Sequence, residues 1–277
     1  MSGMMDTILN LGLNDEIYDG LSKNTKNSRF AGDTYRRFLQ IYGNVAQGLC
    51  NEKYESVLSK FKKEHDYTSD LEMKAEDWSE IIDVFKNIFQ PPLDPRIQLE
   101  QSIRAVFSSW DNPRAKRYRS FNDIPDNLGT DVIVQAMVFG NMGETSGSGV
   151  GLTRNPATGE KKFYGEYLKN AAGEDVVAGT RTPHDLKQFK IDQPELYDQL
   201  YQVQEKLEQH YREMQDLEFT IEDKKLYLLQ TRTGKRTAKA SVKIAVDLVN
   251  EGLIKERAAL KRIELERMNF FLHTSND

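Results

Sequence analysis

The chain has 277 residues, of which 38% are hydrophobic and 29% charged, and its formal net charge is -5. This apolar content is enough for one large domain or two small ones, and the acidic balance argues against a nucleic-acid backbone as partner. The single cysteine, Cys50, excludes intramolecular disulfides and cysteine-based zinc sites and favours a reducing compartment. With no signal-peptide pattern and no apolar run of roughly 20 residues, we predict a cytoplasmic protein without a membrane partner.

The first part of the chain has the pattern of helices. Between residues 15 and 90, apolar residues recur every three or four positions, which is typical of amphipathic helices. Three prolines at positions 91, 92 and 95 end this run. A further helix is expected after them, with its apolar stripe at Leu99, Ile103, Phe107 and Trp110.

The second part mixes strand and helix patterns. Residues 131–139 (DVIVQAMVF) predict a strand of the buried kind. The remaining expected elements are, in chain order, a strand at 162–168, a long charged helix at 184–215, strands at 217–221 and 226–232 around a turn at 222–224, a helix at 238–253 and a short charged helix to about 271. Helices followed by a mixed sheet with packed helices define an α+β fold.

A glycine-rich segment, Gly140 to Gly151, follows the predicted strand at 131–139. Glycine allows close backbone approach, and successive exposed peptide N–H groups form an anion site, to which Ser146 and Ser148 add hydroxyl donors. The segment thus predicts a cradle for phosphates, although it is not a Walker A motif and G-x-G-x-G alone is a weak signal. The alternative is a surface loop between two strands.

The predicted hairpin at 217–232 carries polar side chains in alternation. With a three-residue turn, residue 216 would pair with 230 and residue 218 with 228, so that one face would hold Asp216, Glu218, Gln230 and Arg232. Two carboxylates and an amide oxygen are ligands for Mg²⁺, and an arginine beside them can stabilise a transferring phosphoryl group. The alternative is a half-solvated hairpin with a cross-strand ion pair.

Arg154, Glu166 and Glu174 form a third candidate group, which could border a polyphosphate. The alternative for the region around Arg154 is ordinary turn chemistry, because Asn155-Pro156 and Thr158-Gly159 indicate a tight connection.

Three long segments resemble the nucleotide-binding domain of pyruvate, phosphate dikinase: residues 134–168 (VQAMVFGNMGETSGSGVGLTRNPATGEKKFYGEYL), 171–183 and 214–237, together with the opening SGMMDTILNLGLND. The resemblance implies an ATP-grasp-like fold, with a mixed or antiparallel sheet, packed helices and a helical subdomain. It also implies a transferase (a kinase) that passes the β-phosphoryl group of ATP to a histidine on a separate domain. In such an enzyme, pyruvate and phosphate become phosphoenolpyruvate and pyrophosphate, and AMP is released. The implied partners are ATP, the phosphohistidine domain and the pyruvate-binding domain.

The resemblance also implies roles for individual residues. Arg232 matches the catalytic arginine, and the Mg²⁺ ligands match Asp216, Glu218 and Gln230. The residues implied in nucleotide binding are Gln135, Met137, Val138, Ser146, Gly147, Ser148, Gly149, Glu166 and Glu174. The implied organisation is a helical subdomain at 15–95, a nucleotide-binding core at 96–236 with 1–14 as its leading segment, and a helical linker at 237–277.

The sequence departs from the family pattern at both ends. Ser2 stands where the family has proline, and the family's upstream phosphate-binding lysine and arginine have no counterpart here. The family's Thr-Ser-His motif is not matched either. We therefore expect a fragment that lacks the full dikinase turnover by itself. The alternative is a truncated, non-catalytic remnant that binds nucleotide weakly or serves only as an interaction module.

Overall fold

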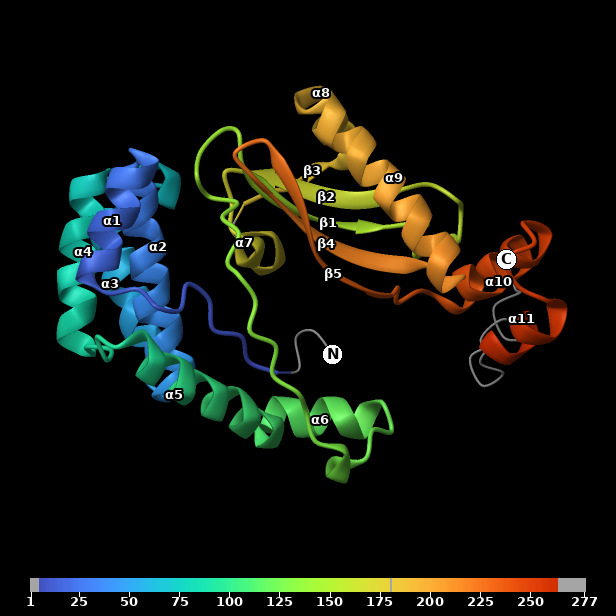
Figure 1. Cartoon of the computed structure of the whole chain (residues 1–277), viewed down its shortest axis with the longest axis horizontal. Helices are drawn as coiled ribbons and strands as arrows, with labels where there is room; N and C mark the ends of the chain where they lie inside the picture. The colour runs from blue at the N-terminus through green and yellow to red at the C-terminus, as the bar shows by residue number, and fades with distance from the viewer. Residues whose placement is uncertain (1–4, 180, 264–277) are drawn as a thin grey trace. The chain divides into compact units, whose positions relative to one another are not determined.

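The computed structural model describes residues 5–179 and 181–263, and the chain divides into two compact units, 1–137 and 138–277 (Figure 1). Unit 1 is helical, and unit 2 holds an antiparallel sheet with packed helices. The expected α+β architecture is confirmed. The three-part division predicted from the sequence stays a prediction.

Unit 1 is built around a helical core, as the apolar spacing of residues 15–90 predicts. Its helices are α1 (Asp15–Thr25), α2 (Ser28–Ile41), the π-helix η1 (Tyr42–Ala46), α3 (Asn51–Glu64), the short η2 (Asp70–Glu72), α4 (Ala75–Ile88), α5 (Pro95–Ser108), η3 (Ser109–Asp111), α6 (Pro113–Phe121) and η4 (Asp126–Leu128). Asn14 and Asn27 cap α1 and α2 by accepting a hydrogen bond from a peptide N–H of the first turn. Aromatic side chains such as Phe38, Trp78 and Phe85 fill the core.

The face that α5 buries differs from the prediction. In the expected stripe, Phe107 is 49% exposed and Trp110 is buried in η3 beyond the end of α5, whereas the buried side chains of α5 are Gln98 and Ser102. The Gln98 amide accepts a hydrogen bond from the Gly12 N–H at 2.9 Å and donates to the Leu13 carbonyl at 3.0 Å. The polar face of α5 is therefore buried because Gln98 provides hydrogen-bond partners for the peptide groups of the leading segment. The spacing of apolar residues alone does not reveal this.

Asp70 makes unit 1 sensitive to acid. Burial alone would raise the pKa of Asp70, but Arg36 at 2.6 Å and Lys62 at 2.8 Å outweigh it and hold the pKa below the ordinary 3.8. The ion pairs therefore stabilise the fold above about pH 4, and this contribution is lost as the pH falls through the lowered pKa. Urea denaturation should show that Asp70→Asn lowers the free energy of unfolding at pH 7 and lowers it by less at pH 3. An equal difference at both pH values would contradict this.

Unit 2 contains a five-stranded sheet in the order β3-β2-β1-β4-β5, with every described neighbouring pair antiparallel. Its strands are β1 (Gly147–Leu152), β2 (Tyr164–Lys169), β3 (His184–Asp185), β4 (Gln215–Glu222) and β5 (Lys225–Thr233), and its helices are α7 (Gly173–Ala178), α8 (Leu186–Asp192), α9 (Pro194–Tyr211), α10 (Ala238–Asn250) and α11 (Glu256–Arg262). The predicted strands at 162–168, 217–221 and 226–232 and the helix at 238–253 are confirmed within a few residues. The short charged helix predicted to about residue 271 is present as α11. The part of this prediction that follows residue 263 lies outside the described residues.

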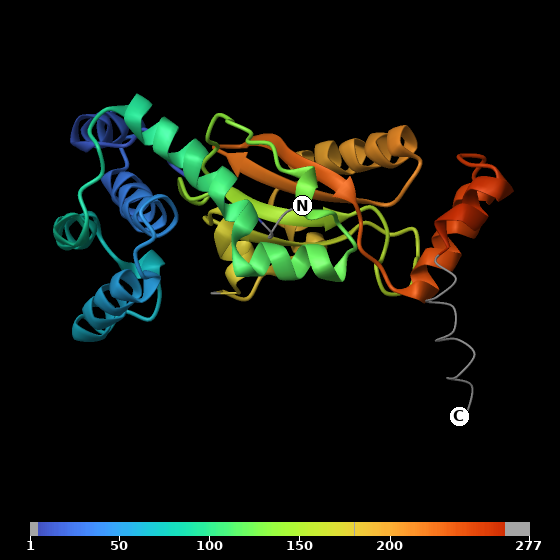
Figure 2. The same ribbon diagram turned by 90° about the horizontal axis from the view of Figure 1, so that it is seen from below.

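Helices cover both faces of this sheet (Figure 2). On one face α8 and α9 pack Phe189 and Leu200 against Leu217 and Phe219 of β4. On the other face α7 packs Val176 against the sheet. The single long helix predicted at 184–215 is wrong, because Pro194 starts a new helix, so that α8 ends at Asp192 and α9 begins after Gln193.

The buried strand predicted at 131–139 is also wrong. Residues 131–137 belong to no helix or strand, and Ile133 and Val134 are 84% and 66% exposed. A β-branched run forms a strand only where a neighbouring strand pairs with its peptide groups. Within residues 5–179 and 181–263, no strand pairs with this segment.

Gly149 is held in β1 by close packing on both sides. A Cβ atom at this position would lie 2.6 Å from the Glu166 carbonyl oxygen and would collide with the Phe219 ring. We expect Gly149→Ala to lower the free energy of unfolding by about 1–3 kcal/mol through overpacking. Gly173→Ala is the matched control, because a Cβ atom there meets no atom within 4 Å. Equal unfolding midpoints for the two variants would contradict the packing role.

Candidate functional site

The β4–β5 hairpin brings the four predicted polar residues onto one face of the sheet. Asp216 pairs with Arg232 and Glu218 with Gln230, and directly paired residues of an antiparallel sheet point to the same side. The shared face is confirmed, but the predicted pairing of 216 with 230 and 218 with 228 is wrong.

The register differs because the hairpin has a shorter turn and an additional bulge. Asp223 and Lys224 form a two-residue turn with φ of 43° and 64°, as in type I′ hairpins. The ladder then shifts by one residue at Glu218/Phe219, which leaves Leu229 as the extra residue of β5. A two-residue turn alone would place Leu229 opposite Glu218. The bulge at Leu229 restores the alternation that turns Gln230 and Arg232 toward the acidic side chains.

The same face extends across the sheet. Glu166 on β2 and Glu218 on β4 both pair with Val150 of β1, so a continuous row runs from Glu166 to Gln230. The helix α7, which carries Glu174 in its first turn, packs on this face through Val176. The structure therefore brings Glu166 to the face predicted from the sequence and places the helix of Glu174 over it. Val150, which forms the apolar floor between the acidic groups, was not predicted, although its position two residues after Ser148 is a usable signal.

Arg232 forms an ion pair with Asp216. Its Nη2 and Nε atoms lie 2.7 and 2.8 Å from Asp216 Oδ2, and the two side chains are 38% and 17% exposed. This cross-strand ion pair is the alternative that the sequence left open, and it is compatible with a phosphate site because the guanidinium stays accessible. Among the described residues, no three His, Cys, Asp or Glu side chains form a metal-binding group. The oxygen donors here are two carboxylates and one amide.

The second half of the glycine-rich segment is a strand. Gly147 to Leu152 form the central strand β1, whose peptide groups pair with both β2 and β4. The Ser148 hydroxyl is buried and donates to the Ala171 carbonyl at 2.9 Å. The expectation of an open loop is therefore wrong for residues 147–152, where the glycines pack closely against neighbouring strands. Contact of Ser146, Gly147, Ser148 and Gly149 with phosphates stays a prediction.

The residues before β1 are tied to the turn of the β4–β5 hairpin. The Ser146 hydroxyl accepts a hydrogen bond from the Asp223 N–H at 2.9 Å, and the Thr145 hydroxyl donates to the Asp223 carboxylate at 3.0 Å. The Phe139 N–H also donates to the Glu222 carboxylate at 2.7 Å. These contacts fix the start of β1 against the tip of the hairpin.

Arg154 does not border the candidate phosphate face. Its side chain is fully buried and pairs with Glu208 at 2.7 Å and with Glu251 at 2.9 Å. Burial alone would lower the pKa of Arg154, but the hydrogen bonds to Glu208 and Glu251 raise it. The arginine therefore joins the end of β1 to α9 and to the segment after α10, and the expected contact with a polyphosphate is wrong.

The predicted adenine residues fall at the boundary of the two units. Gln135 and Met137 end unit 1 and are exposed, and Val138 begins unit 2. Their role in nucleotide binding stays a prediction.

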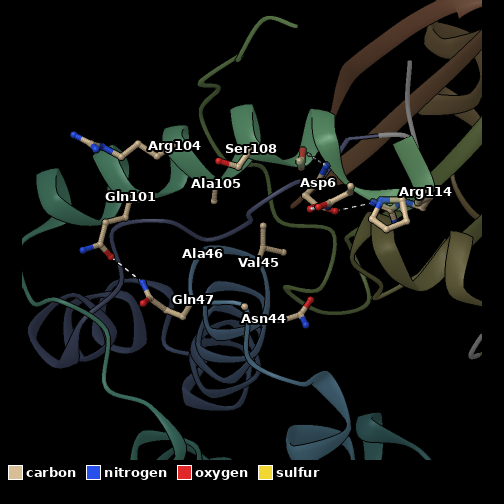
Figure 3. A pocket seen from close by; sticks show the side chains of 14 residues that line it. Asp6, Asn44, Val45, Ala46, Gln47, Gln101, Arg104, Ala105, Ser108 and Arg114 are labelled. Atoms are coloured by element: carbon tan, nitrogen blue, oxygen red, sulfur yellow. Dashed lines mark hydrogen bonds and ion pairs between the residues drawn. The ribbon is translucent and has the colours of Figure 1, made fainter. Parts of the chain in front are cut away.

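Unit 1 has an open cavity of ≈ 880 Å³ between η1 and α5 (Figure 3). Its polar groups already have partners: Gln101 accepts a hydrogen bond from Gln47 at 2.9 Å, and Asp6 pairs with Arg114 at 2.7 Å. None of the site residues predicted from the sequence lines this cavity. It is therefore a less suitable phosphate site than the polar face of the sheet.

Comparisons with known proteins show the family to which the chain belongs. The family profile "Pyruvate phosphate dikinase, AMP/ATP-binding domain" matches residues 1–198 and 186–253. The chain is 52% identical to pyruvate, phosphate dikinase of Clostridium symbiosum over 99% of its length, 52% to pyruvate, phosphate dikinase 2 of Zea mays and 51% to the chloroplastic enzyme of Flaveria trinervia. It spans 32%, 32% and 29% of these proteins, which is about a third of their length.

The sheet with its polar face and the helical unit before it thus belong to a nucleotide-binding class of domain. The chain is a member of the pyruvate phosphate dikinase AMP/ATP-binding domain family. In the described residues, no helix is both long and apolar enough to cross a membrane.

Proposed function

We propose that the chain binds Mg-ATP, with the polyphosphate on the polar face of β4 and β5. The observation that carries the proposal is the set of directly paired residues Asp216–Arg232 and Glu218–Gln230, with Arg232 accessible and oriented by Asp216. A guanidinium held in this way is suited to stabilising charge on a phosphoryl group. Glu166 and Glu174 would border the same ligand, and Gln135, Met137 and Val138 would contact the adenine.

The donor set fits Mg²⁺. Asp216, Glu218 and Gln230 offer only oxygen atoms from one side of the sheet, and Mg²⁺ in nucleotide sites takes one or two carboxylates together with phosphate oxygens and water. Bound there, the ion would neutralise phosphate charge. Arg232 would then shift part of its interaction from the Asp216 carboxylate to the phosphoryl group.

In the intact enzyme, we propose that this unit supplies ATP for phosphoryl transfer to a histidine on a separate domain, with pyruvate and phosphate converted to phosphoenolpyruvate and pyrophosphate and AMP released. The support is the family membership together with the accessible Arg232 beside Asp216 on the polar face. A cytoplasmic location remains part of the proposal; some relatives are chloroplastic. The second candidate is a non-catalytic remnant that holds nucleotide weakly or acts only as an interaction module. It is favoured if no ATP binds.

Glu218→Gln tests the metal assignment. We expect the variant to lose the Mg²⁺-dependent part of its ATP affinity, roughly tenfold, since one charge-assisted contact is worth about 1.5 kcal/mol or more. Calorimetric titration of ATP with Mg²⁺ and with EDTA measures this difference. Glu205→Gln, at an exposed position of α9, is the matched control. If Mg²⁺ strengthens ATP binding equally in both variants, Glu218 is not a metal ligand.

A further inference from the structure

The segment 139–146, which leads into β1, is anchored at both ends within unit 2. Near its start, the Gly140 carbonyl accepts a hydrogen bond from the Ala171 N–H at 2.9 Å. At its end, the Ser146 carbonyl accepts one from the Asn170 N–H at 2.8 Å. Because Asn170 and Ala171 directly follow β2, the segment forms a loop at one end of the sheet.

The turn of the β4–β5 hairpin holds the same two ends of the segment. Glu222 accepts a hydrogen bond from the Phe139 N–H at 2.7 Å. Asp223 contacts the other end twice: its N–H donates to the Ser146 hydroxyl at 2.9 Å, and its carboxylate accepts from the Thr145 hydroxyl at 3.0 Å. The position of the loop relative to the sheet therefore depends on the tip of the hairpin.

The middle of the segment has the properties of an anion-binding turn. Gly143 has a φ of 136°, a value that favours glycine, and a Cβ atom there would meet no atom within 4 Å. Among the described residues, the peptide N–H groups of Gly143, Glu144 and Thr145 have no hydrogen-bond partner. Successive N–H groups without partners form concave sites for phosphate oxygens. The turn, and not the paired strand β1, offers such groups.

The segment starts on the side of the sheet that carries the proposed Mg-ATP site. Side chains alternate along β4, so Glu222 lies on the same side as Glu218. At a rise of about 3.4 Å per residue, these two positions are about 14 Å apart, which is comparable with the length of an extended ATP molecule. A nucleotide with its metal-bound phosphates at Asp216 and Glu218 therefore has its nucleoside end near Glu222. There Val138, which is predicted to contact the adenine, directly precedes Phe139.

We propose that Glu222 and Asp223 are positioning residues, which hold the segment 139–146 so that its open N–H groups contact the α-phosphate of the nucleotide. The inference rests on the proposed Mg-ATP site and gives that site a direction, with the metal end at Asp216 and Glu218 and the nucleoside end at the hairpin turn. A carboxylate repels a phosphate, so Glu222 and Asp223 act through the loop and do not bind the ligand themselves.

Equilibrium titrations with ATP and with AMP test this assignment. Asp223→Gly keeps the left-handed backbone, with φ of 43°, but loses the carboxylate. It should weaken the binding of both nucleotides roughly threefold to tenfold, the effect of one hydrogen bond. Asp223→Asn keeps an oxygen acceptor for Thr145 and tolerates the same backbone, so it should restore most of the affinity. Arg232→Ala, at the metal end, should weaken ATP binding much more than AMP binding.

The outcomes separate this inference from the Mg-ATP site itself. Asp123→Gly is the matched control, because Asp123 is an exposed turn residue of unit 1 with φ of 51°, and it should change neither affinity. If Arg232→Ala loses ATP affinity but Asp223→Gly binds AMP like the parent, the positioning role is overturned and the Mg-ATP site stands. If neither variant changes ATP affinity, the site is wrong and this inference falls with it.

Hydrogen exchange tests the anchor at Glu222 in the absence of nucleotide. Glu222→Ala removes the carboxylate that accepts the Phe139 N–H and should accelerate exchange of that amide about tenfold. Glu222→Gln keeps an acceptor oxygen and should exchange like the parent. AMP affinity should fall in the alanine variant and be retained in the glutamine variant. Unchanged exchange of Phe139 in Glu222→Ala, or faster exchange with unchanged AMP affinity, would contradict the positioning role.

Discussion

Arg232→Ala should weaken Mg-ATP binding by about tenfold to a hundredfold. A charge-assisted contact to phosphate contributes roughly 1.5–3 kcal/mol, and each 1.4 kcal/mol corresponds to a factor of ten in affinity. Because Asp216 holds the guanidinium at 2.7 Å, the arginine is already ordered before the ligand binds. Its removal also leaves the Asp216 carboxylate without its partner, next to the incoming phosphates, which adds to the loss.

Two further variants separate charge from geometry. Arg232→Lys keeps the charge but loses the planar fork, so its affinity should lie between those of the parent and Arg232→Ala. Lys239→Ala removes an exposed cation of α10 and should leave affinity unchanged. Equal affinity of Arg232→Ala and the parent chain in calorimetric titrations would remove Arg232 from the site.

Arg154→Met should cause the largest loss of stability in unit 2. The arginine is fully buried and its guanidinium contacts Glu208, Glu251 and Asp247, at 2.7, 2.9 and 3.5 Å respectively. The substitution leaves the buried Glu208 without its counter-ion, and breaking a buried ion pair in this way typically costs about 3–5 kcal/mol. We expect a loss of this size in the free energy of unfolding, measured by urea denaturation.

The structure also supplies a matched control and a local readout for Arg154. Lys243→Met removes a half-exposed cation that pairs with the same Asp247 at 2.8 Å, and it should cost about 1 kcal/mol or less. Hydrogen exchange should accelerate in α10 and α11 of Arg154→Met more than in β4 and β5, because the network joins the C-terminal helices to the sheet. Similar costs for the two variants would show that Arg154 is not the centre of this network.

The sequence predicts the β4–β5 hairpin well because the information is local. Alternating polar and apolar residues fix which side chains share a face. Asp216 and Arg232 lie on the polar face of the hairpin, and α8 and α9 cover the opposite face. The register in which β4 pairs with β5 is harder to predict from the sequence. The two-residue type I′ turn at Asp223-Lys224 shifts the pairing by one residue relative to the assumed three-residue turn, and the bulge at Leu229 shifts it by one more. Because the total shift is two residues, each side chain is predicted on the correct face although the predicted pairs are wrong.

Other features depend on contacts that a single sequence does not display. Glycine permits both an open loop and a tightly packed strand, and only the positions of Phe219 and Glu166 show that Gly149 belongs to a strand. The segment 131–139 has strand propensity, but its pairing depends on a neighbour elsewhere. Arg154 stands in a turn-rich motif, and its acidic partners lie 54 and 97 residues away.

The central claim is that nucleotide phosphates and their metal ion lie on the polar face of β4 and β5. Paramagnetic broadening of amide NMR signals by Mn²⁺-ATP tests it most directly, because the effect depends on distance to the metal and is visible even for weak binding. We predict ATP-dependent broadening that is strongest for Asp216–Glu218 and Gln230–Arg232 and is lost in Glu218→Gln. Broadening centred on the unit 1 cavity at Gln101 and Arg114, or broadening by Mn²⁺ that ATP does not change, would contradict the assignment.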